Sequence, residues 1–394
     1  MSRSLKKFSI PLCGLGFSML AALALLQCKH VDGERQAFVL QSIPQQGDLP
    51  SYGENVWRRY LASIPLAEQR GEAIQKDCYP RILRPSGPIK GVAFLLHGFT
   101  ACPQQFLEIA EQLTAQGYEV VLPLHPGHGY TPLEKTSDNL QHLPNQGNFN
   151  QIYGNFVKSM VEMAREYKGM DRVVAGLSLG GSMAVYAGIE GQDVWTRQLI
   201  MVPALEMAVP SSLLAGTLNN LNNLSGDGIF NQSLTKWIFN FRTGWGVGCA
   251  NERSQAKPRA GICDFLLGNI VGMNQFGYNT AEKISPTRIK TQFVLVEGDG
   301  AISNKKALEA AASMSAGPEI QSNPNLLQLC VLPKDLGHSF LSRFDSPAQD
   351  KYWIPGLNRE LTKFIVKGDF VRQDSHSKLL KQPSCDFDGK RNAP

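Results

Sequence analysis

Charged residues are scarce in this chain of 394 residues: Asp, Glu, Lys and Arg make up 19% of it, and the formal net charge is only +5. No long run of lysine or arginine is present, so binding to nucleic acid has no support in the sequence. The cysteines form neither a CxxC pair nor a cluster with histidine at zinc spacing, which leaves out the common structural zinc sites. No internal repeat is visible, so a repeat architecture is not expected.

The N-terminus carries a targeting pattern. Three basic side chains lie within the first seven residues and precede an apolar stretch over residues 10–26. A basic start followed by such a stretch is typical of a secretory signal. An uncleaved membrane anchor is the alternative, because the stretch approaches the roughly 20 residues that span a bilayer. Cysteine, glycine and serine interrupt the stretch, however, and it ends close to Cys28.

The segment "LLQC" at the end of this stretch resembles the lipobox of bacterial lipoproteins, although Gln27 stands where the family usually has Gly or Ala. The resemblance implies that residues 1–27 are a signal peptide and that Cys28 carries the lipid. The protein would then be exported and anchored in the bacterial cell envelope, on the periplasmic or the outer surface. Plain secretion and an uncleaved anchor remain open.

The rest of the chain has globular composition, with 43% hydrophobic residues. Residues 28–80 are expected to form a tether with one short helix at "ENVWRRYLAS", and residues 371–394 a polar tail. Between them, apolar strands alternate with amphipathic helices. Strands are expected over residues 91–98, 119–124, 171–176, 197–204, 291–299 and 325–333. Helices are expected over residues 103–118, 151–167, 181–188, 303–314 and 357–368. This alternation predicts a doubly wound, mostly parallel α/β sheet over residues 81–370.

The alternation is lost between residues 205 and 285, in a block rich in Asn, Gly and aromatic residues. The block is too long for a connecting loop in a compact domain, so we expect an inserted cap. It contains Cys249 and Cys263, and a disulfide between them would stiffen it. Six cysteines follow Cys28, and their pairing, or their presence as buried thiols, stays open.

The stretch "RVVAGLSLGG" supplies a candidate nucleophile, Ser178, between a strand and a helix. A serine hydroxyl needs a base to become nucleophilic, and it must be presented where a substrate carbonyl can reach it. A sharp turn from strand to helix does this, and it requires glycines such as Gly176 and Gly180. The short pattern alone is not specific, but its context fits the mechanism.

Three motifs together resemble the α/β-hydrolase family, and within it the capped esterases and monoacylglycerol-lipase-like enzymes. They are "FLLHGFTACPQQF", "LPLHPGHGYTP" and "GLSLGG", and the resemblance covers roughly residues 81–368. It implies an oxyanion hole made by the backbone N–H groups of Phe99 and Leu179. It also implies that His97 shapes the turn beside Phe99 rather than acting on the substrate.

The base is expected after the last strand, where "VLPKDLGHSF" supplies His338. The acid is expected after the preceding strand, where Asp299 falls at the carboxyl end; Asp335 is the runner-up. His125 and His128 lack a third ligand at suitable spacing, so we interpret them as part of a hydrogen-bonded loop. No metal and no cofactor are expected.

The resemblance implies a serine hydrolase that cleaves small or lipid-derived carboxylic esters of short to medium acyl chain. Thioester or amide cleavage would use the same residues, so the bond type is open. A catalytically silent binding protein on the same fold is the main alternative. A dinucleotide-binding oxidoreductase is disfavoured, since "LIMVPA" ends without the acidic residue that would hold the ribose.

Overall fold

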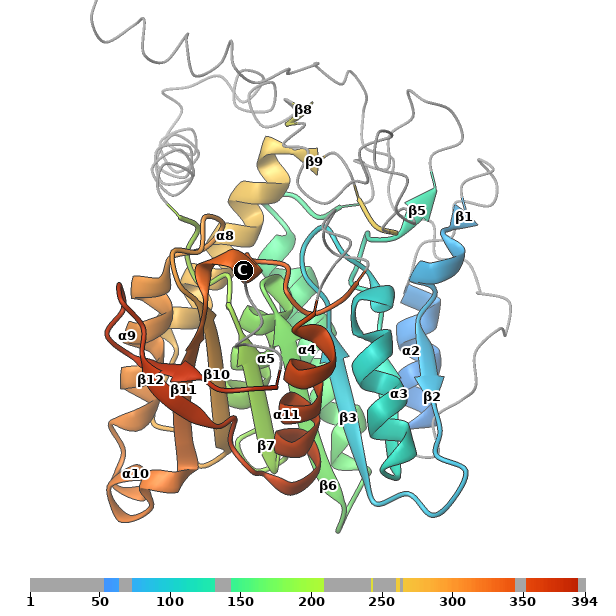
Figure 1. Ribbon diagram of the computed structural model, residues 1–394. Helices are drawn as coiled ribbons and strands as arrows, with labels where there is room; N and C mark the ends of the chain where they lie inside the picture. The colour runs from blue at the N-terminus through green and yellow to red at the C-terminus, as the bar shows by residue number, and fades with distance from the viewer. Residues whose placement is uncertain are drawn as a thin grey trace, which may run out of the picture.

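The computed structural model describes residues 53–63, 73–131, 143–208, 242–243, 260–262, 265–343 and 352–388. In this part of the chain a nine-stranded sheet has the order β12-β13-β11-β10-β7-β6-β3-β4-β2 (Figure 1). The strands are β2 (Arg81–Leu83), β3 (Gly91–Leu96), β4 (Tyr118–Leu122), β6 (Asp171–Leu177), β7 (Arg197–Met201), β10 (Lys290–Val296), β11 (Leu327–Leu332), β12 (Gln373–His376) and β13 (Pro383–Cys385). Within this described sheet, β2 and β12 are the two edge strands that pair antiparallel with their neighbours, and the other pairs are parallel.

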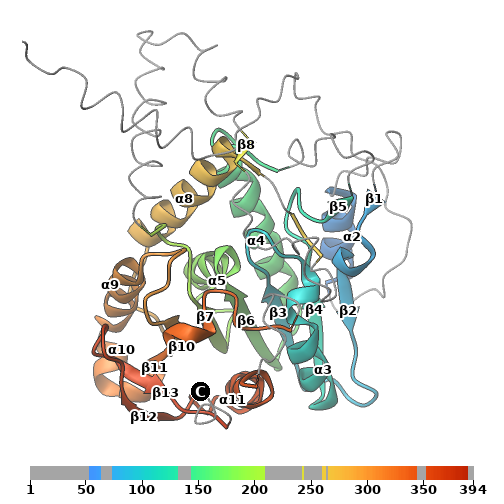
Figure 2. The same ribbon diagram turned by 45° about the horizontal axis from the view of Figure 1, so that its top comes forward.

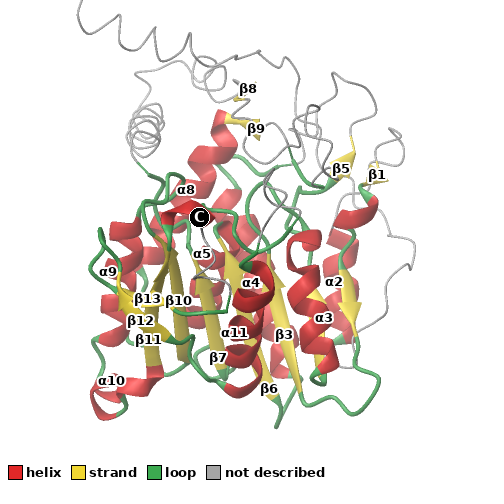
Figure 3. Ribbon diagram, in the orientation of Figure 1, coloured by secondary structure: helices red, strands yellow, loops and turns green. Residues whose placement is uncertain are grey.

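Helices cover both faces of this sheet (Figures 2 and 3). Helices α3 (Leu107–Ala115) and α11 (Ile354–Lys367) pack together on one face. The other face carries α2 (Glu54–Ser63), α4 (Phe149–Arg165), α5 (Leu179–Glu190) and α8 (Leu267–Glu282), and α9 (Asn304–Ser315) and α10 (Pro318–Ser322) lie further along the chain. Two short pairs complete the strands: β1 (Ala73–Ile74) with β5 (Tyr130–Thr131), and β8 (Arg242–Thr243) with β9 (Phe265–Leu266).

Strand β3 shows why this arrangement follows from the sequence. All six of its residues are buried, and the five that follow Gly91 alternate between two core clusters. Val92 and Phe94 pack with α4 and α5, whereas Ala93 and Leu95 pack with α3 and α11. A strand covered on both faces is apolar throughout, as the sequence predicts for a parallel sheet. The mostly parallel α/β sheet is therefore confirmed.

Helix α8 lies within the block that the sequence predicts as a cap, and no helix is expected there from the sequence. It contacts α4 and α5, so most of its surface is buried and no polar stripe marks it as amphipathic. Gly277 is required by this packing, because a Cβ there would lie 2.0 Å from the carbonyl oxygen of Ala204. The last part of the block thus belongs to the core of the fold.

The structure also differs from the sequence analysis after residue 371, where a polar tail is expected. Strands β12 and β13 extend the sheet, and β13 pairs with β11. Cys385 is fully buried and forms a disulfide with Cys330, and Phe387 is buried as well. A few apolar side chains and one disulfide are enough to fix a segment whose average composition is polar.

A second disulfide joins Cys78 to Cys102, so four of the six cysteines after Cys28 are paired. Cys249 and Cys263 lie outside the described residues, as do the whole signal segment and most of the predicted cap. Among the helices of the described ranges, none is both long enough and apolar enough to cross a membrane.

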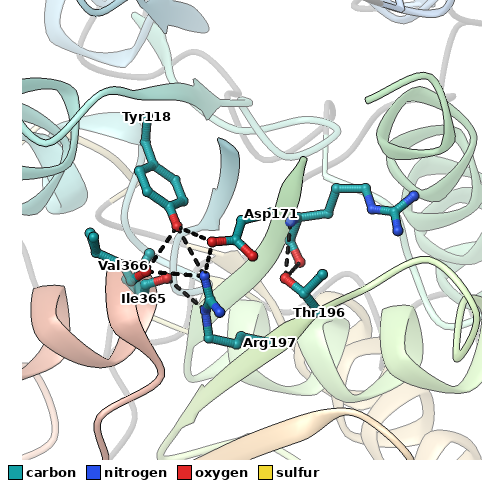
Figure 4. A network of polar contacts seen from close by, with 7 residues as sticks. Tyr118, Asp171, Thr196, Arg197, Ile365 and Val366 are labelled. Carbon is teal, nitrogen blue, oxygen red and sulfur yellow. Dashed lines mark hydrogen bonds and ion pairs between the residues drawn. The ribbon is translucent and has the colours of Figure 1, made fainter. Parts of the chain in front are cut away.

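A network of hydrogen bonds and an ion pair lies at the amino ends of the strands (Figure 4). Arg197 at the start of β7 forms an ion pair with Asp171 at the start of β6, and both contact the hydroxyl of Tyr118. Arg197 also donates to the carbonyl oxygens of Ile365 and Val366, 2.8 and 3.2 Å away, in the last turn of α11. This network fastens α11 to the sheet at the end opposite the site described next.

Candidate active site

Ser178 lies between β6 and α5 in a backbone conformation that non-glycine residues rarely adopt, with φ 60° and ψ −117°. Such a residue costs about 1–3 kcal/mol and persists only where its surroundings hold it. Here the Ser178 N–H donates to the carbonyl of Met201 at 3.0 Å. The Ser178 carbonyl accepts from the N–H groups of Ser182 and Ala204, also at 3.0 Å each. Backbone bonds to the end of β7 thus hold the serine in the turn.

The glycines of the GxSxG pattern are required by close packing around this turn. A Cβ on Gly176 would lie 1.9 Å from the carbonyl oxygen of Gly180. A Cβ on Gly180 would lie 1.9 Å from the carbonyl oxygen of Leu96 in β3. Helix α5 therefore starts in direct contact with two strand ends, which brings Ser178 to the carboxyl edge of the sheet.

His338 and Asp299 come together at the same edge, after β11 and β10. The Nδ1 atom of His338 lies 2.7 Å from Oδ2 of Asp299. The Asp299 side chain is fully buried, whereas that of His338 is 20% exposed. The other carboxylate oxygen of Asp299 accepts from the backbone N–H groups of Ala301 and Ile302, at 2.8 and 3.3 Å. The acid is thus fixed, and the imidazole turns its Nε2 atom away from it.

Burial by itself raises the pKa of Asp299, but the charge of His338 and the hydrogen bonds from His338, Ala301 and Ile302 outweigh it and lower the pKa below 3.8. The carboxylate is therefore ionised at neutral pH. It accepts the Nδ1–H of His338, which leaves Nε2 as the proton acceptor of the neutral ring.

The runner-up acid, Asp335, does not reach His338 in the structure. It is exposed and accepts a long hydrogen bond, 3.4 Å, from the hydroxyl of Tyr352. Glu297, which precedes Asp299 in the same loop, accepts instead from the backbone N–H of Leu379 at 2.5 Å. Of the three carboxylates near the ends of these strands, Asp299 is the one hydrogen-bonded to the histidine.

The two predicted oxyanion donors lie beside Ser178 for separate reasons. Leu179 is the first residue of α5, so its N–H has no partner within the helix and lies at the positive end of the helix dipole. The N–H of Phe99 shares a peptide unit with the carbonyl of Gly98. That carbonyl accepts from Nδ1 of His97 at 2.9 Å and from the N–H of Ala101 at 3.1 Å. Because the two groups of a trans peptide point in opposite directions, these bonds aim the Phe99 N–H the other way.

Three buried histidines, His97, His125 and His128, contact one another beside the loop that carries Phe99. Nε2 of His97 accepts from the backbone N–H of His125 at 3.0 Å, so the His97 ring is neutral with its proton on Nδ1. Burial lowers the pKa of His128 to about 4, and its Nε2–H donates to the carbonyl of Phe99. The His125 ring stacks on His97 with centroids 3.6 Å apart. Neither nitrogen of the His125 ring has a hydrogen-bond partner among the described residues.

The sequence predicts His125 and His128 as parts of a hydrogen-bonded loop. In the structure, the His97 and His128 rings form hydrogen bonds within this loop, and His125 takes part through its backbone N–H. Over the described ranges, no group of three His, Cys, Asp or Glu side chains is placed to hold a metal ion.

Ser178 and His338 line one cavity of about 350 Å³. Its walls are mainly apolar and come from several elements: Phe99, Met207, Phe265, Ile270, Met273 and Ile302. No carboxylate is among the described residues that line it. Of these wall residues, only Phe99 is predicted individually from the sequence, while Phe265 belongs to the aromatic-rich block predicted as a cap. The spacing of Ile270 and Met273, one turn apart, was the available signal for the contribution of α8.

Several aromatic residues of the block predicted as a cap lie outside the described residues, among them Trp237, Phe239, Phe241 and Trp245. The described part of the cap nevertheless touches the site. Phe265 packs edge-on against Phe99 with centroids 5.4 Å apart. At the other end of the block, the carbonyl of Glu206 accepts from the N–H of Ser303, beyond the Asp299 loop.

Comparisons with known proteins give matches to one family model, to a curated relative and to solved structures. Residues 87–242 match the family model "Serine aminopeptidase, S33". A monoglyceride lipase homolog of monkeypox virus is 25% identical over 142 residues, which cover 36% of this chain and 49% of the relative. The match thus spans about half the length of that curated relative. Ser178, Phe99 and Leu179 lie within the matched family range, whereas Asp299 and His338 lie beyond it.

Among solved structures, a soluble variant of monoglyceride lipase from Saccharomyces cerevisiae in complex with a substrate analog is similar, with a TM-score of 0.51 and 14% identity. The similarity covers 72% of this chain and 89% of that one. At this identity it is evidence for the fold alone. Together with the mostly parallel sheet, the helices on both of its faces and the turn at Ser178, it shows that the chain has the α/β-hydrolase fold.

Proposed function

We propose that the protein is a serine hydrolase that cleaves carboxylic esters through an acyl-enzyme. The observation that carries the proposal is the shared cavity: a serine held in a strained turn and a histidine bound to a buried carboxylate line the same apolar space. A nucleophile, a base and a group that orients the base are the three parts that this chemistry needs.

In the proposed reaction, the Oγ atom of Ser178 attacks the ester carbonyl while Nε2 of His338 takes the serine proton. The Asp299 carboxylate stabilises the imidazolium that forms. The N–H groups of Phe99 and Leu179 bind the negative oxygen of the tetrahedral intermediate. His338 then protonates the leaving alcohol, and a water molecule activated by the same base releases the acid from Ser178.

The cavity supports a neutral, apolar acyl group as the substrate moiety. Burying each methylene contributes about 0.8 kcal/mol, and the walls are formed by methionine, isoleucine and phenylalanine side chains. Ligand pockets typically measure about 300–1,000 Å³, so this cavity is at the small end of the range. We therefore propose short to medium acyl chains, including lipid-derived esters. The names of the monoglyceride lipase relatives support a lipid-derived ester as the substrate class.

The name of the matched family raises an aminopeptidase as the second candidate. An aminopeptidase has to bind the ammonium group at the end of a peptide, and a buried ammonium needs a carboxylate or a comparable partner. The described cavity wall offers none. Rates on p-nitrophenyl esters of two to twelve carbons, set against rates on aminoacyl p-nitroanilides, test the choice. Higher kcat/KM on the anilides would overturn the ester assignment.

Covalent labelling tests whether the site is active at all. A fluorophosphonate probe should modify the protein once, and peptide mass spectrometry should place the adduct on Ser178. Absence of an adduct, in a protein that a melting curve shows to be folded, would instead favour the silent binding protein on the same fold.

The lipid anchor also remains a proposal, and it is supported by the sequence pattern at Cys28. Stable anchoring needs about two acyl chains, since a single chain gives marginal binding. We expect the mature protein to begin at a lipid-modified Cys28 in the cell envelope. An unmodified N-terminus elsewhere, or unchanged detergent partitioning after Cys28→Ser, would contradict this.

A further inference from the structure

Three segments far apart in the chain meet beside Phe99, and we call their junction the oxyanion clamp: residues 75–78, the loop 98–105 and the strap 260–262. The first segment precedes the sheet, and the third lies in the block predicted as a cap. The first and the third lie outside residues 87–242, which match the family model. The clamp is therefore an addition to the matched part of the fold.

A disulfide forms the first contact of the oxyanion clamp. It joins Cys78 to Cys102, both essentially fully buried, with their Cα atoms 5.1 Å apart. Cys102 stands at the start of the short helix that follows the loop carrying Phe99. The covalent bond thus ties the donor loop to the segment before the sheet.

Hydrogen bonds form the second contact. The N–H of Ile262 donates to the carbonyl of Thr100 at 3.1 Å, directly after Phe99. The side-chain amide of Gln75 bridges to both backbone groups of Gly261, donating to its carbonyl at 2.9 Å and accepting from its N–H at 3.2 Å. The strap is therefore held against the donor loop on one side and against the N-terminal segment on the other.

Gly261 shows how closely these parts approach. Its φ is +139°, a conformation that side chains rarely adopt, and a Cβ there would lie 2.2 Å from the carbonyl oxygen of Thr100. Any other residue must displace the Thr100 peptide or the strap. Since Thr100 follows Phe99 directly, such a displacement reaches the peptide unit that carries the oxyanion donor.

We propose that Gln75, Gly261 and the Cys78–Cys102 disulfide are positioning groups for the Phe99 N–H, so that the N-terminal segment and the cap strap jointly set the oxyanion hole. None of the three lines the cavity around Ser178. Their effect on the reaction therefore passes through Phe99. This inference rests on the proposed ester hydrolysis.

The two disulfides provide a matched test in the full-length protein. Cys78→Ala/Cys102→Ala should lower kcat on a short p-nitrophenyl ester by about 10- to 100-fold, because an oxyanion donor contributes on the order of 100-fold or more. KM should change little. Cys330→Ala/Cys385→Ala opens a longer loop, with a separation of 55 against 24 residues, and should lower Tm at least as much while kcat stays near wild type. Equal losses of kcat in the two variants would overturn the proposal.

Two point variants keep the proposal testable if the disulfide variant does not fold. Gln75→Ala removes only the bridge to the strap and should lower kcat about 5- to 10-fold, a fraction of the effect of losing a whole donor. Gly261→Ala should lower it further, whereas Gly87→Ala, at a site with open space, should leave it unchanged. The affinity for a trifluoromethyl ketone, which forms an oxyanion on the serine, should fall in parallel with kcat; a purely structural role would lower Tm and leave this affinity intact.

Failure of the clamp and failure of the proposed function give different results. A wild-type protein with neither esterase activity nor a fluorophosphonate adduct would contradict the function itself. An active wild type whose folded clamp variants retain full kcat and full affinity for the ketone would contradict the clamp alone.

Discussion

The two ends of the sheet each hold a carboxylate paired with a basic side chain, yet the pairs are suited to different tasks. At the amino ends, Asp171 pairs with Arg197; at the carboxyl ends, Asp299 pairs with His338. An arginine side chain stays protonated at any pH at which proteins are folded, so it cannot transfer a proton. A histidine changes charge near neutral pH and can take up and release one.

The surroundings of the two pairs differ in the same sense. Around Arg197 the polar groups bind one another and the last carbonyls of α11, and burial raises the pKa of Tyr118, which keeps its hydroxyl neutral. Around His338 an apolar cavity opens beside a serine in a strained conformation. Satisfied polar groups at one end of the sheet thus stabilise it, while polar groups left available at the other end are suited to chemistry.

The largest expected effect is on the carboxyl end. Ser178→Ala should lower kcat/KM for ester hydrolysis by at least about 10⁴-fold, because the nucleophile is lost and losses within such a unit are not additive. Stability should change by less than about 1 kcal/mol, because the backbone bonds that hold the turn remain. Steady-state kinetics with a thermal melt measure both. Retention of more than a few per cent of the activity by a folded variant would disprove the assignment.

Asp299→Asn should lower kcat by about 10²- to 10⁴-fold, because the amide no longer stabilises the imidazolium. Asp335→Asn is the matched control, since that residue is exposed and does not reach His338. It should keep wild-type kinetics. A larger loss in the control than in Asp299→Asn would show that the acid was assigned to the wrong residue.

The Asp299→Asn variant should also change how the free energy of unfolding depends on pH in the acid range. The pKa of Asp299 in the folded state is lowered below 3.8, so the ionised carboxylate stabilises the fold above that pH and the contribution is lost as pH falls through the folded-state pKa. The free energies of unfolding of wild type and Asp299→Asn should therefore converge as the pH is lowered from 5 towards 2. Urea unfolding at several pH values measures this.

At the amino end the expectation is reversed. Arg197→Met should lower the free energy of unfolding by about 2 kcal/mol or more, because it leaves partly buried oxygens without their donor, and kcat should stay unchanged. Arg165→Met breaks an exposed pair with Asp193 and should cost about 0–1 kcal/mol. A fall in kcat for folded Arg197→Met would show that the two ends of the sheet are coupled.

The smallest expected effect concerns the histidines behind the donor loop. Burial lowers the pKa of His125 well below 6.5, so the unfolded state binds one more proton and stability falls as pH drops below 6.5. His125→Phe keeps an aromatic ring against His97 and removes that proton. Its stability should fall less steeply than that of wild type between pH 6.5 and 5, in thermal melts at matched ionic strength. An unchanged slope would contradict the buried neutral state.

Sequence reasoning succeeded where neighbours in the chain decide the structure. Helix α4 follows from its apolar spacing, and the turn at Ser178 follows from its glycines. It failed for α8, whose surface is buried on several sides and shows no amphipathic stripe. It also failed for β13, where a disulfide and a few apolar residues hold a segment of polar composition.

By itself, the sequence determined the alternation of strands and helices over residues 91–204 and 291–368, the α/β class and the residue types available at the carboxyl edge, because these depend on local periodicity and glycine spacing. Only the tertiary structure decided that Asp299 rather than Asp335 binds His338, which cysteines pair, and that Gly261 presses on the loop of Phe99. Several carboxylates and cysteines are chemically suited to each of these contacts. The choice among them depends on distances between segments far apart in the chain, and folding alone fixes those distances.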